Sequence, residues 1–131
     1  MLRYIKILFF IFVLLNGHIL YAQKISNENP NEISDYNKEL INNGTIKPLS
    51  MLKTENEEKY NLIISFIPKN EVIENYYYSV ALPENKNIVY LIYYYESLFN
   101  KYSTWMGDPT GKCFSALFNE NGEFIKRVFW R

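Results

Sequence analysis

Two alternating apolar runs near the end of the chain, in CFSALFNENGEFIKRVFW at residues 113–130, most constrain its fold. Alternate positions that would share a face are Phe114, Ala116 and Phe118 in the first run, and Ile125, Arg127 and Phe129 in the second. The connection Asn119-Glu120-Asn121-Gly122 is typical of a type I turn in which Gly122 adopts positive φ. Residues 113–130 are therefore predicted to form a β-hairpin within a larger antiparallel sheet.

Three further segments are predicted to be strands because they alternate in polarity or are rich in tyrosine and β-branched residues. They are KYNLIISFIP at 59–68, NYYYSVAL at 75–82 and IVYLIYYYE at 88–96. Residues 83–87 are predicted to form the turn between the last two. Residues 95–103 are ambiguous, since their apolar side chains also recur at helical spacing.

One helix is predicted, at residues 32–43, where Ile33, Tyr36, Leu40 and Ile41 would lie on one face. Asn31 is the predicted N-cap, and Gly44 suits the C-terminal stop. A helix followed by antiparallel strands indicates an α+β domain. We expect an N-terminal helix packed on an antiparallel sheet of about four or five strands, ending in the hairpin.

The first 22 residues are predicted to be a secretory signal peptide. Arg3 and Lys6 precede an apolar run, and polar sequence begins directly after Ala22, where we place the cleavage. Residues 23–131 would then form a single small domain. The alternative is a membrane anchor that is kept. In both cases we expect the domain to be exported, to the periplasm or the cell exterior.

The composition excludes several kinds of chemistry. The single histidine, His18, would be removed with the leader, and Cys113 is the single cysteine. Imidazole-dependent nucleophilic catalysis, zinc binding and disulfide redox chemistry all need more of these residues, so no metal or cofactor is predicted. Cys113 is expected to be a buried free thiol in a strand.

The charge of the chain is balanced. Without Arg3 and Lys6, 12 basic residues face 14 acidic ones. Such interspersed, nearly balanced charge predicts no nucleic-acid partner, and membrane contact is expected only through the N-terminal segment if it is uncleaved.

The stretch GDPTGKC at residues 107–113 superficially resembles the start of a phosphate-binding loop. Such a loop needs four residues between its glycines and a hydroxyl residue after the lysine. Here three residues separate Gly107 from Gly111, Pro109 has no N–H to donate, and Cys113 replaces the hydroxyl. The stretch is predicted to be a connecting turn.

An enzyme would have to depend on carboxylates, of which the candidates are Glu71, Glu74, Glu84, Glu96 and Asp108. Two of them would have to converge for acid–base work, and their spacing does not show that any do. The acidic run of Glu55, Glu57 and Glu58 is typical of a solvated loop.

The segment at residues 100–112 is the predicted binding loop, with site residues Tyr102, Trp105, Met106 and Asp108. Loops lie at the surface, and tryptophan often carries binding energy at interfaces. The alternative is that Trp105 covers one end of the core. Outward-facing tyrosines, among Tyr77, Tyr93 and Tyr95, would offer a second surface for a protein or a glycan.

Three functions are consistent with these features. The first, which we favour, is an exported non-enzymatic binding module that contacts an envelope or secreted protein, or a glycan, through aromatic side chains. The second is an inhibitor or immunity-type protein that blocks a secreted enzyme. The third is a carboxylate-dependent hydrolase.

Overall fold

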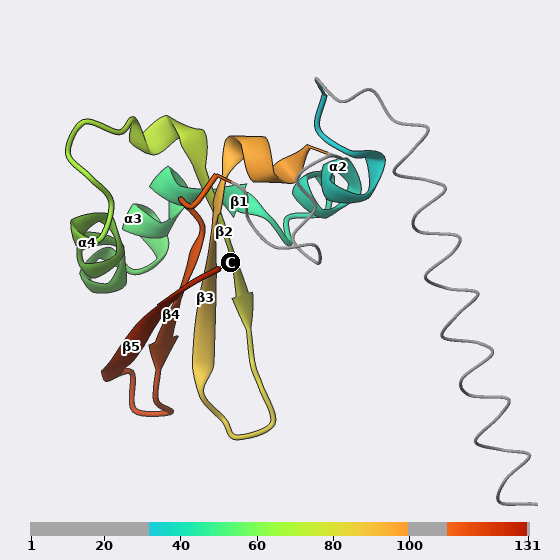
Figure 1. The fold of residues 1–131 in the computed structure, drawn as a ribbon. Coiled ribbons are helices and arrows are strands. Elements are labelled where there is room, and N and C mark those ends of the chain that lie inside the picture. Colours follow the sequence, from blue (N-terminus) through green and yellow to red (C-terminus); the bar gives the residue numbers. More distant parts are fainter. Residues whose placement is uncertain (1–31, 100–109, 131) are drawn as a thin grey trace, which may run out of the picture.

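A five-stranded antiparallel sheet with helices on both faces forms the body of the protein (Figure 1). The structure, a computed structural model, describes residues 32–99 and 110–130. Its strands are β1 (Lys47–Pro48), β2 (Tyr76–Ala81), β3 (Ile88–Tyr94), β4 (Phe114–Phe118) and β5 (Phe124–Phe129). They lie in the order β1-β2-β3-β4-β5, so strands consecutive in the chain are neighbours in the sheet. The predicted α+β class is confirmed.

One short helix precedes the first strand, and further short helices and turns lie between the strands. They are α2 (Asp35–Asn42), α3 (Leu52–Glu55) and α4 (Glu57–Ser65), with the 3₁₀ turns η1 (Leu49–Met51), η2 (Ile73–Asn75) and η3 (Tyr95–Leu98). In the two described ranges, none of the helices has the length and apolar character needed to cross a membrane.

The predicted N-terminal helix is present as α2, with a later start. Its cap is Ser34 rather than Asn31, and the Ser34 side chain accepts a hydrogen bond from the Asn37 N–H at 3.2 Å. A serine oxygen at this place satisfies one of the N–H groups that the first turn leaves unpaired. The helix stops before Gly44, which adopts a φ of +81°. Asn37 Nδ2 donates to the Leu98 carbonyl at 2.9 Å, which ties α2 to η3.

The predicted strand at 59–68 is wrong, because these residues lie mostly in helix α4. The Asn56 side chain caps the helix by accepting from the Lys59 N–H at 3.1 Å. Glu57 and Glu58 occupy the first turn, where acidic groups favour the helix dipole. The apolar run is compatible with both periodicities, and the cap decides for the helix. The acidic run is accordingly a helix junction, which corrects the predicted solvated loop.

The C-terminal hairpin forms as predicted, around Gly122 at a φ of +83°. The Asn119 side chain accepts from the N–H groups of Asn121 and Glu123, at 3.0 and 2.9 Å. The register shifts by one residue at the start of β5, so that Phe124 rather than Ile125 lies opposite β4. The β5 residues that share a face are therefore Phe124, Arg127 and Phe129, not the predicted Ile125, Arg127 and Phe129.

The tyrosine-rich segments pair as the predicted strands β2 and β3, with Tyr78 opposite Ile92. Strand β3 ends at Tyr94, two residues earlier than predicted, because η3 takes over. This confirms the helical alternative for residues 95–98; residues 100–103 lie outside the described ranges. Strand β1 was not predicted.

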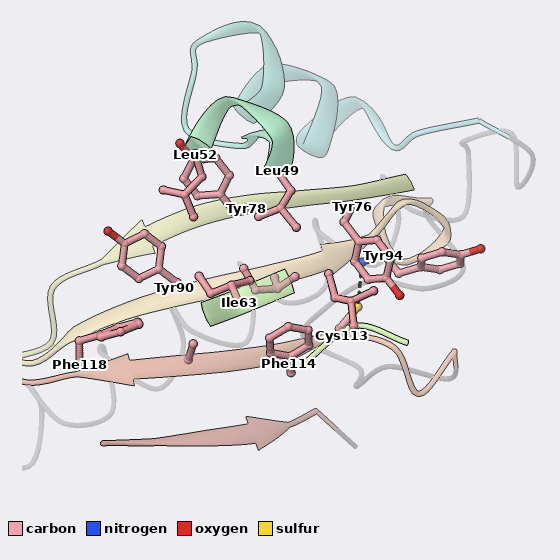
Figure 2. Close-up of a cluster of buried hydrophobic side chains, with 13 residues drawn as sticks. Leu49, Leu52, Ile63, Tyr76, Tyr78, Tyr90, Tyr94, Cys113, Phe114 and Phe118 are labelled. Carbon is pink, nitrogen blue, oxygen red and sulfur yellow. Dashed lines mark hydrogen bonds between the residues drawn. The ribbon is translucent and has the colours of Figure 1, made fainter. Parts of the chain in front are cut away.

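The main core lies between the sheet and the α3–α4 side (Figure 2). We call this side of the sheet the α4 face. The buried residues of this core are Leu49, Leu52, Ile63, Ile67, Tyr76, Tyr78, Tyr90, Ile92, Tyr94, Cys113, Phe114, Ala116 and Phe118. Since each buried aromatic ring removes roughly 150–250 Å² from water, these rings dominate the stability of the fold.

A smaller cluster of buried side chains lies on the opposite face, where α2 packs against it. Figure 1 shows α2 on the other side of the sheet from α3 and α4. Ile46, Tyr93 and Leu98 are buried in this cluster, and Leu40 and Ile41 of α2 pack against them. The α4 face is therefore covered up to β5, whose side chains stay exposed, and the opposite face is covered only in part.

Candidate binding surface

The predicted binding residues Tyr102, Trp105, Met106 and Asp108 lie outside the described residues. Their role stays a prediction. Any candidate surface that the structure itself supports has to come from residues 32–99 and 110–130.

The tyrosine surface predicted on β2 and β3 is largely closed. Tyr93 is buried beneath α2, and its hydroxyl is hydrogen-bonded to the Ser79 hydroxyl at 2.9 Å. The ring of Trp130 covers it further, with ring centroids 5.2 Å apart. Tyr77 and Tyr95 are half-buried. A partner therefore cannot stack on the ring of Tyr93.

Exposed apolar side chains gather instead on β5. All six of its residues are exposed, and the large apolar ones are Phe124 (41%), Ile125 (45%), Val128 (42%) and Phe129 (47%). These side chains are exposed because β5 is the last strand of the sheet and no described strand lies beyond it.

Aromatic rings join β5 to the end of α4. The Phe66 ring lies 5.4 Å from that of Phe124 and 6.1 Å from that of Phe114. The Arg127 guanidinium lies 4.8 Å from the centroid of Phe66 and 4.6 Å from that of Phe129. We call these exposed and half-buried side chains the β5 surface: Phe66, Phe124, Ile125, Arg127, Val128 and Phe129.

Two depressions flank this surface on the α4 face. One, of about 610 Å³, lies at the start of β5 between α4 and the hairpin turn, beside Leu62 and Phe124. The other, of about 220 Å³, lies at the end of β5 beside Phe66 and Phe129. The Phe66 ring and Arg127 stand between them. Each depression is a recess at one end of β5. The recess beside Phe129 is mostly apolar, whereas the recess beside Phe124 combines Leu62 and Phe118 with the charged side chains of Glu58, Lys59 and Glu123.

The centre of β5 is cationic. Lys126 and Arg127 are exposed, and no carboxylate of the described residues forms an ion pair with either. The ion pairs lie elsewhere, between Lys38 and Glu32, Lys47 and Glu55, and Lys112 and Glu71. The two cations are therefore available to an acidic group of a partner.

Strands β1 and β2 carry a separate polar cluster with a structural role. Lys47 Nζ donates to Glu55 at 2.8 Å, and the Tyr78 hydroxyl donates to the same carboxylate. Hydrogen bonds from Lys47 and Tyr78 lower the pKa of Glu55. Burial and the hydrogen bond to Glu55 raise the pKa of Tyr78 well above its usual range. At neutral pH Glu55 is thus ionised and Tyr78 neutral, so the pair links α3 to the sheet.

A second ionic contact borders the smaller depression. Lys112 Nζ lies 3.0 Å from Glu71 and 4.1 Å from the centroid of the Tyr94 ring. The hydrogen bond to Glu71 raises the pKa of Lys112, and burial raises the pKa of Tyr76 to about 12. Lys112 is therefore a cation that is already paired.

Two of the candidate carboxylates of a hydrolase have partners in the structure. Glu71 is paired with Lys112, and Glu96 accepts a hydrogen bond from the Tyr95 hydroxyl at 3.3 Å. Asp108 lies outside the described ranges. Across residues 32–99 and 110–130, no three His, Cys, Asp or Glu side chains gather as metal ligands would.

Cys113 is buried, as predicted, but it lies at the residue just before β4 rather than in the strand. Its Sγ accepts a hydrogen bond from the Tyr94 N–H at 3.3 Å (Figure 2). It serves as part of the main core.

Comparison with known proteins adds no relative: no protein-family model matches the chain, and no curated protein or solved structure matches it significantly. The β5 surface is therefore argued from its own geometry.

The sequence holds a signal for this surface that the predicted site residues do not include. Successive side chains of a strand point to opposite faces, so adjacent Lys126 and Arg127 place one cation on each face. An unpaired charge is rarely buried. Neither face at the centre of β5 can therefore be covered, although its ends are apolar.

Proposed function

We propose that this chain is an exported, non-enzymatic binding module that contacts a partner protein of the cell envelope or exterior through the β5 surface. The observation that carries the proposal is the exposure of Phe124, Ile125, Val128 and Phe129, each above 40%, on one edge strand.

The exposed apolar side chains of β5 form two adjacent pairs, Phe124–Ile125 and Val128–Phe129, one at each end of the strand, which supports a binding role. Isolated apolar side chains are ordinary on protein surfaces, whereas contiguous ones mark interaction sites. An edge strand with exposed apolar residues also risks aggregation. The simplest explanation for an exposed apolar edge is a partner that covers it when bound.

A protein partner is favoured over a glycan. The outer edge of β5 presents backbone N–H and C=O groups at the spacing of a strand, which another polypeptide matches. Glycan stacking needs open ring faces. Arg127 already occupies positions over the rings of Phe66 and Phe129.

The test is affinity capture from an envelope extract with the full chain and with the double variant Phe124→Ser/Phe129→Ser. The matched control is Val80→Ser/Leu82→Ser, which removes exposed apolar side chains (49% and 77%) from the opposite part of the sheet. Circular dichroism checks that each variant is folded. Arg127→Glu, at an exposed position, serves as a second variant that removes the cation over the Phe66 and Phe129 rings but keeps both phenylalanines of β5.

A supporting result is one protein, retained by the wild type and the control, lost by both β5 variants, and bound again when purified. Capture that neither β5 variant weakens would contradict the proposal. Retention of a polysaccharide free of protein would replace the protein partner by a glycan. A parallel capture with Trp105→Ala tests the predicted loop, whose role stands beside this proposal.

A further inference from the structure

We infer that β5 takes up an extended segment of the partner as a sixth strand, and that this segment carries an acidic residue between two apolar ones, in the pattern apolar–x–acidic–x–apolar. The inference rests on the proposed function and specifies how the partner is recognised.

The two edges of the sheet differ in their ability to accept a strand. At one edge, β1 has two residues and includes Pro48, which has no N–H to donate. At the other edge, β5 has six residues without proline, about 20 Å at the usual rise per residue. Alternate N–H and C=O groups of such a strand point away from β4. Of the described strand edges, β5 is therefore the open one.

The side chains on the α4 face define the pattern. Phe124, Arg127 and Phe129 lie on this face, as their contacts with Phe66 and with each other show. The two recesses lie beside Phe124 and Phe129, at the ends of the strand. Side chains at positions i, i+2 and i+4 of an added strand share a face and span about 13 Å. The outer two would enter the recesses, and the middle one would meet Arg127.

The charge of β5 selects the middle residue. Lys126 and Arg127 have no acidic partner among the described residues. Opposite charges on neighbouring strands stabilise a sheet, and like charges destabilise it. An acidic residue at the centre of the added strand would therefore form an ion pair with Arg127. A second acidic residue next to it would pair with Lys126 on the other face.

The same charges argue against a second copy of this chain as the occupant. A two-fold dimer would pair β5 with β5 in antiparallel orientation. Registers centred on the middle of the strand place Lys126 or Arg127 opposite a cation of the other copy. The central cations thus oppose self-pairing, and favour an acidic segment of another protein.

The test uses twelve-residue peptides in which every second residue is threonine. Three consecutive positions between the threonines carry phenylalanine, glutamate and phenylalanine, and the counterpart peptide has lysine in place of the glutamate. Binding to the full chain is measured by fluorescence polarisation. We expect the glutamate peptide to bind at least tenfold more tightly than its lysine counterpart. Arg127→Glu is expected to reverse this preference, and Lys53→Glu, at an exposed position on α3, to leave it unchanged.

Methylation of the peptide backbone tests the strand pairing itself. Two forms carry N-methyl groups, either on the Phe-Glu-Phe residues or on the threonines between them. Because an added strand directs only alternate N–H groups to β5, one form is expected to lose binding and the other to keep it. Equal binding of the two forms, equal binding of the glutamate and lysine peptides, or no binding at millimolar concentration would overturn the inference.

Two outcomes separate this inference from the proposed function. If capture depends on Phe124 and Phe129 but the peptides show no acidic preference and no methylation pattern, the surface stands and the added strand is wrong. If capture ignores both residues, the proposed function fails. Sedimentation completes the test, because a dimer that Phe124→Ser/Phe129→Ser dissociates would make a second copy the occupant and overturn the acidic segment.

Discussion

Glu55 shows how one side chain joins two parts of this fold. It ends α3 and accepts hydrogen bonds from Lys47 of β1 and Tyr78 of β2. Tyr78 is buried, so its hydroxyl needs this partner. The contact holds the helical layer in place over the tyrosine-rich strands, although the side chain of Glu55 is itself 44% exposed.

Glu55→Gln is expected to lower the free energy of unfolding by about 1 kcal/mol at pH 7, a modest value because the ion pair is screened by solvent. The pKa of Glu55 is lowered by folding. Its contribution is therefore present above the unfolded value, near the ordinary 4.5, and is lost as the pH falls through the folded value.

Urea unfolding of wild type and variant between pH 2.5 and about 7.5 measures this dependence. The difference between them should shrink steadily below about pH 4.5. Glu84→Gln, in the exposed turn between β2 and β3, is the control and should show no such trend. A difference that stays constant down to the lowest pH would contradict the assigned role of Glu55.

At the scale of elements, sequence reasoning succeeded where local signals were unambiguous. The hairpin followed from two largely alternating runs around Gly122, although the register shift at the start of β5 was not predicted, and α2 followed from helical spacing that ended at Gly44. Both are local patterns that need no tertiary information. The paired strands β2 and β3 followed from their tyrosine and β-branched residues.

The α4 segment shows where such reasoning ends. A run such as Leu62-Ile63-Ile64 is apolar at every position, so its periodicity does not separate a strand from a buried helix. Asn56 followed by two glutamates was the deciding signal, and it was interpreted as a loop. The two-residue strand β1 had no recognisable pattern, because pairing with β2 alone creates it.

Ile63→Ala tests the corrected element. In α4 Ile63 is fully buried, whereas Leu62 is half-buried. Removing buried methyl groups from Ile63 is expected to cost about 2–5 kcal/mol. Asn61→Ala, an exposed change in the same helix, should be nearly neutral. As a strand, the segment would bury Leu62 and Ile64 on one face, so a larger loss for Leu62→Ala than for Ile63→Ala would contradict the helix.

At the scale of the whole molecule, the candidate site was the part least accessible from the sequence. The predicted residues were chosen for their type, a tryptophan and a tyrosine in a loop. The β5 surface depends instead on which strand lies last in the sheet and on how far α4 reaches over it. Strand order is set by pairing between distant segments, which a single sequence does not display.

Export concerns the whole chain, and the N-terminus of the mature product tests it. If residues 1–22 are a cleaved signal peptide, the product recovered outside the cytoplasm should begin at Gln23. Intact-mass measurement of the purified product checks this. An exported product that keeps residues 1–22 in the membrane fraction would support the anchor, and an uncleaved product in the cytoplasm would contradict export.

The most direct test of the β5 surface is hydrogen–deuterium exchange of the full chain, alone and with its captured partner, read from proteolytic fragments. We predict slower exchange in residues 123–130 on binding, because their outward N–H groups gain acceptors, with residues 76–82 unchanged. Slower exchange confined to residues 100–109, with none in 123–130, would contradict the account and move the binding site to the segment around Trp105.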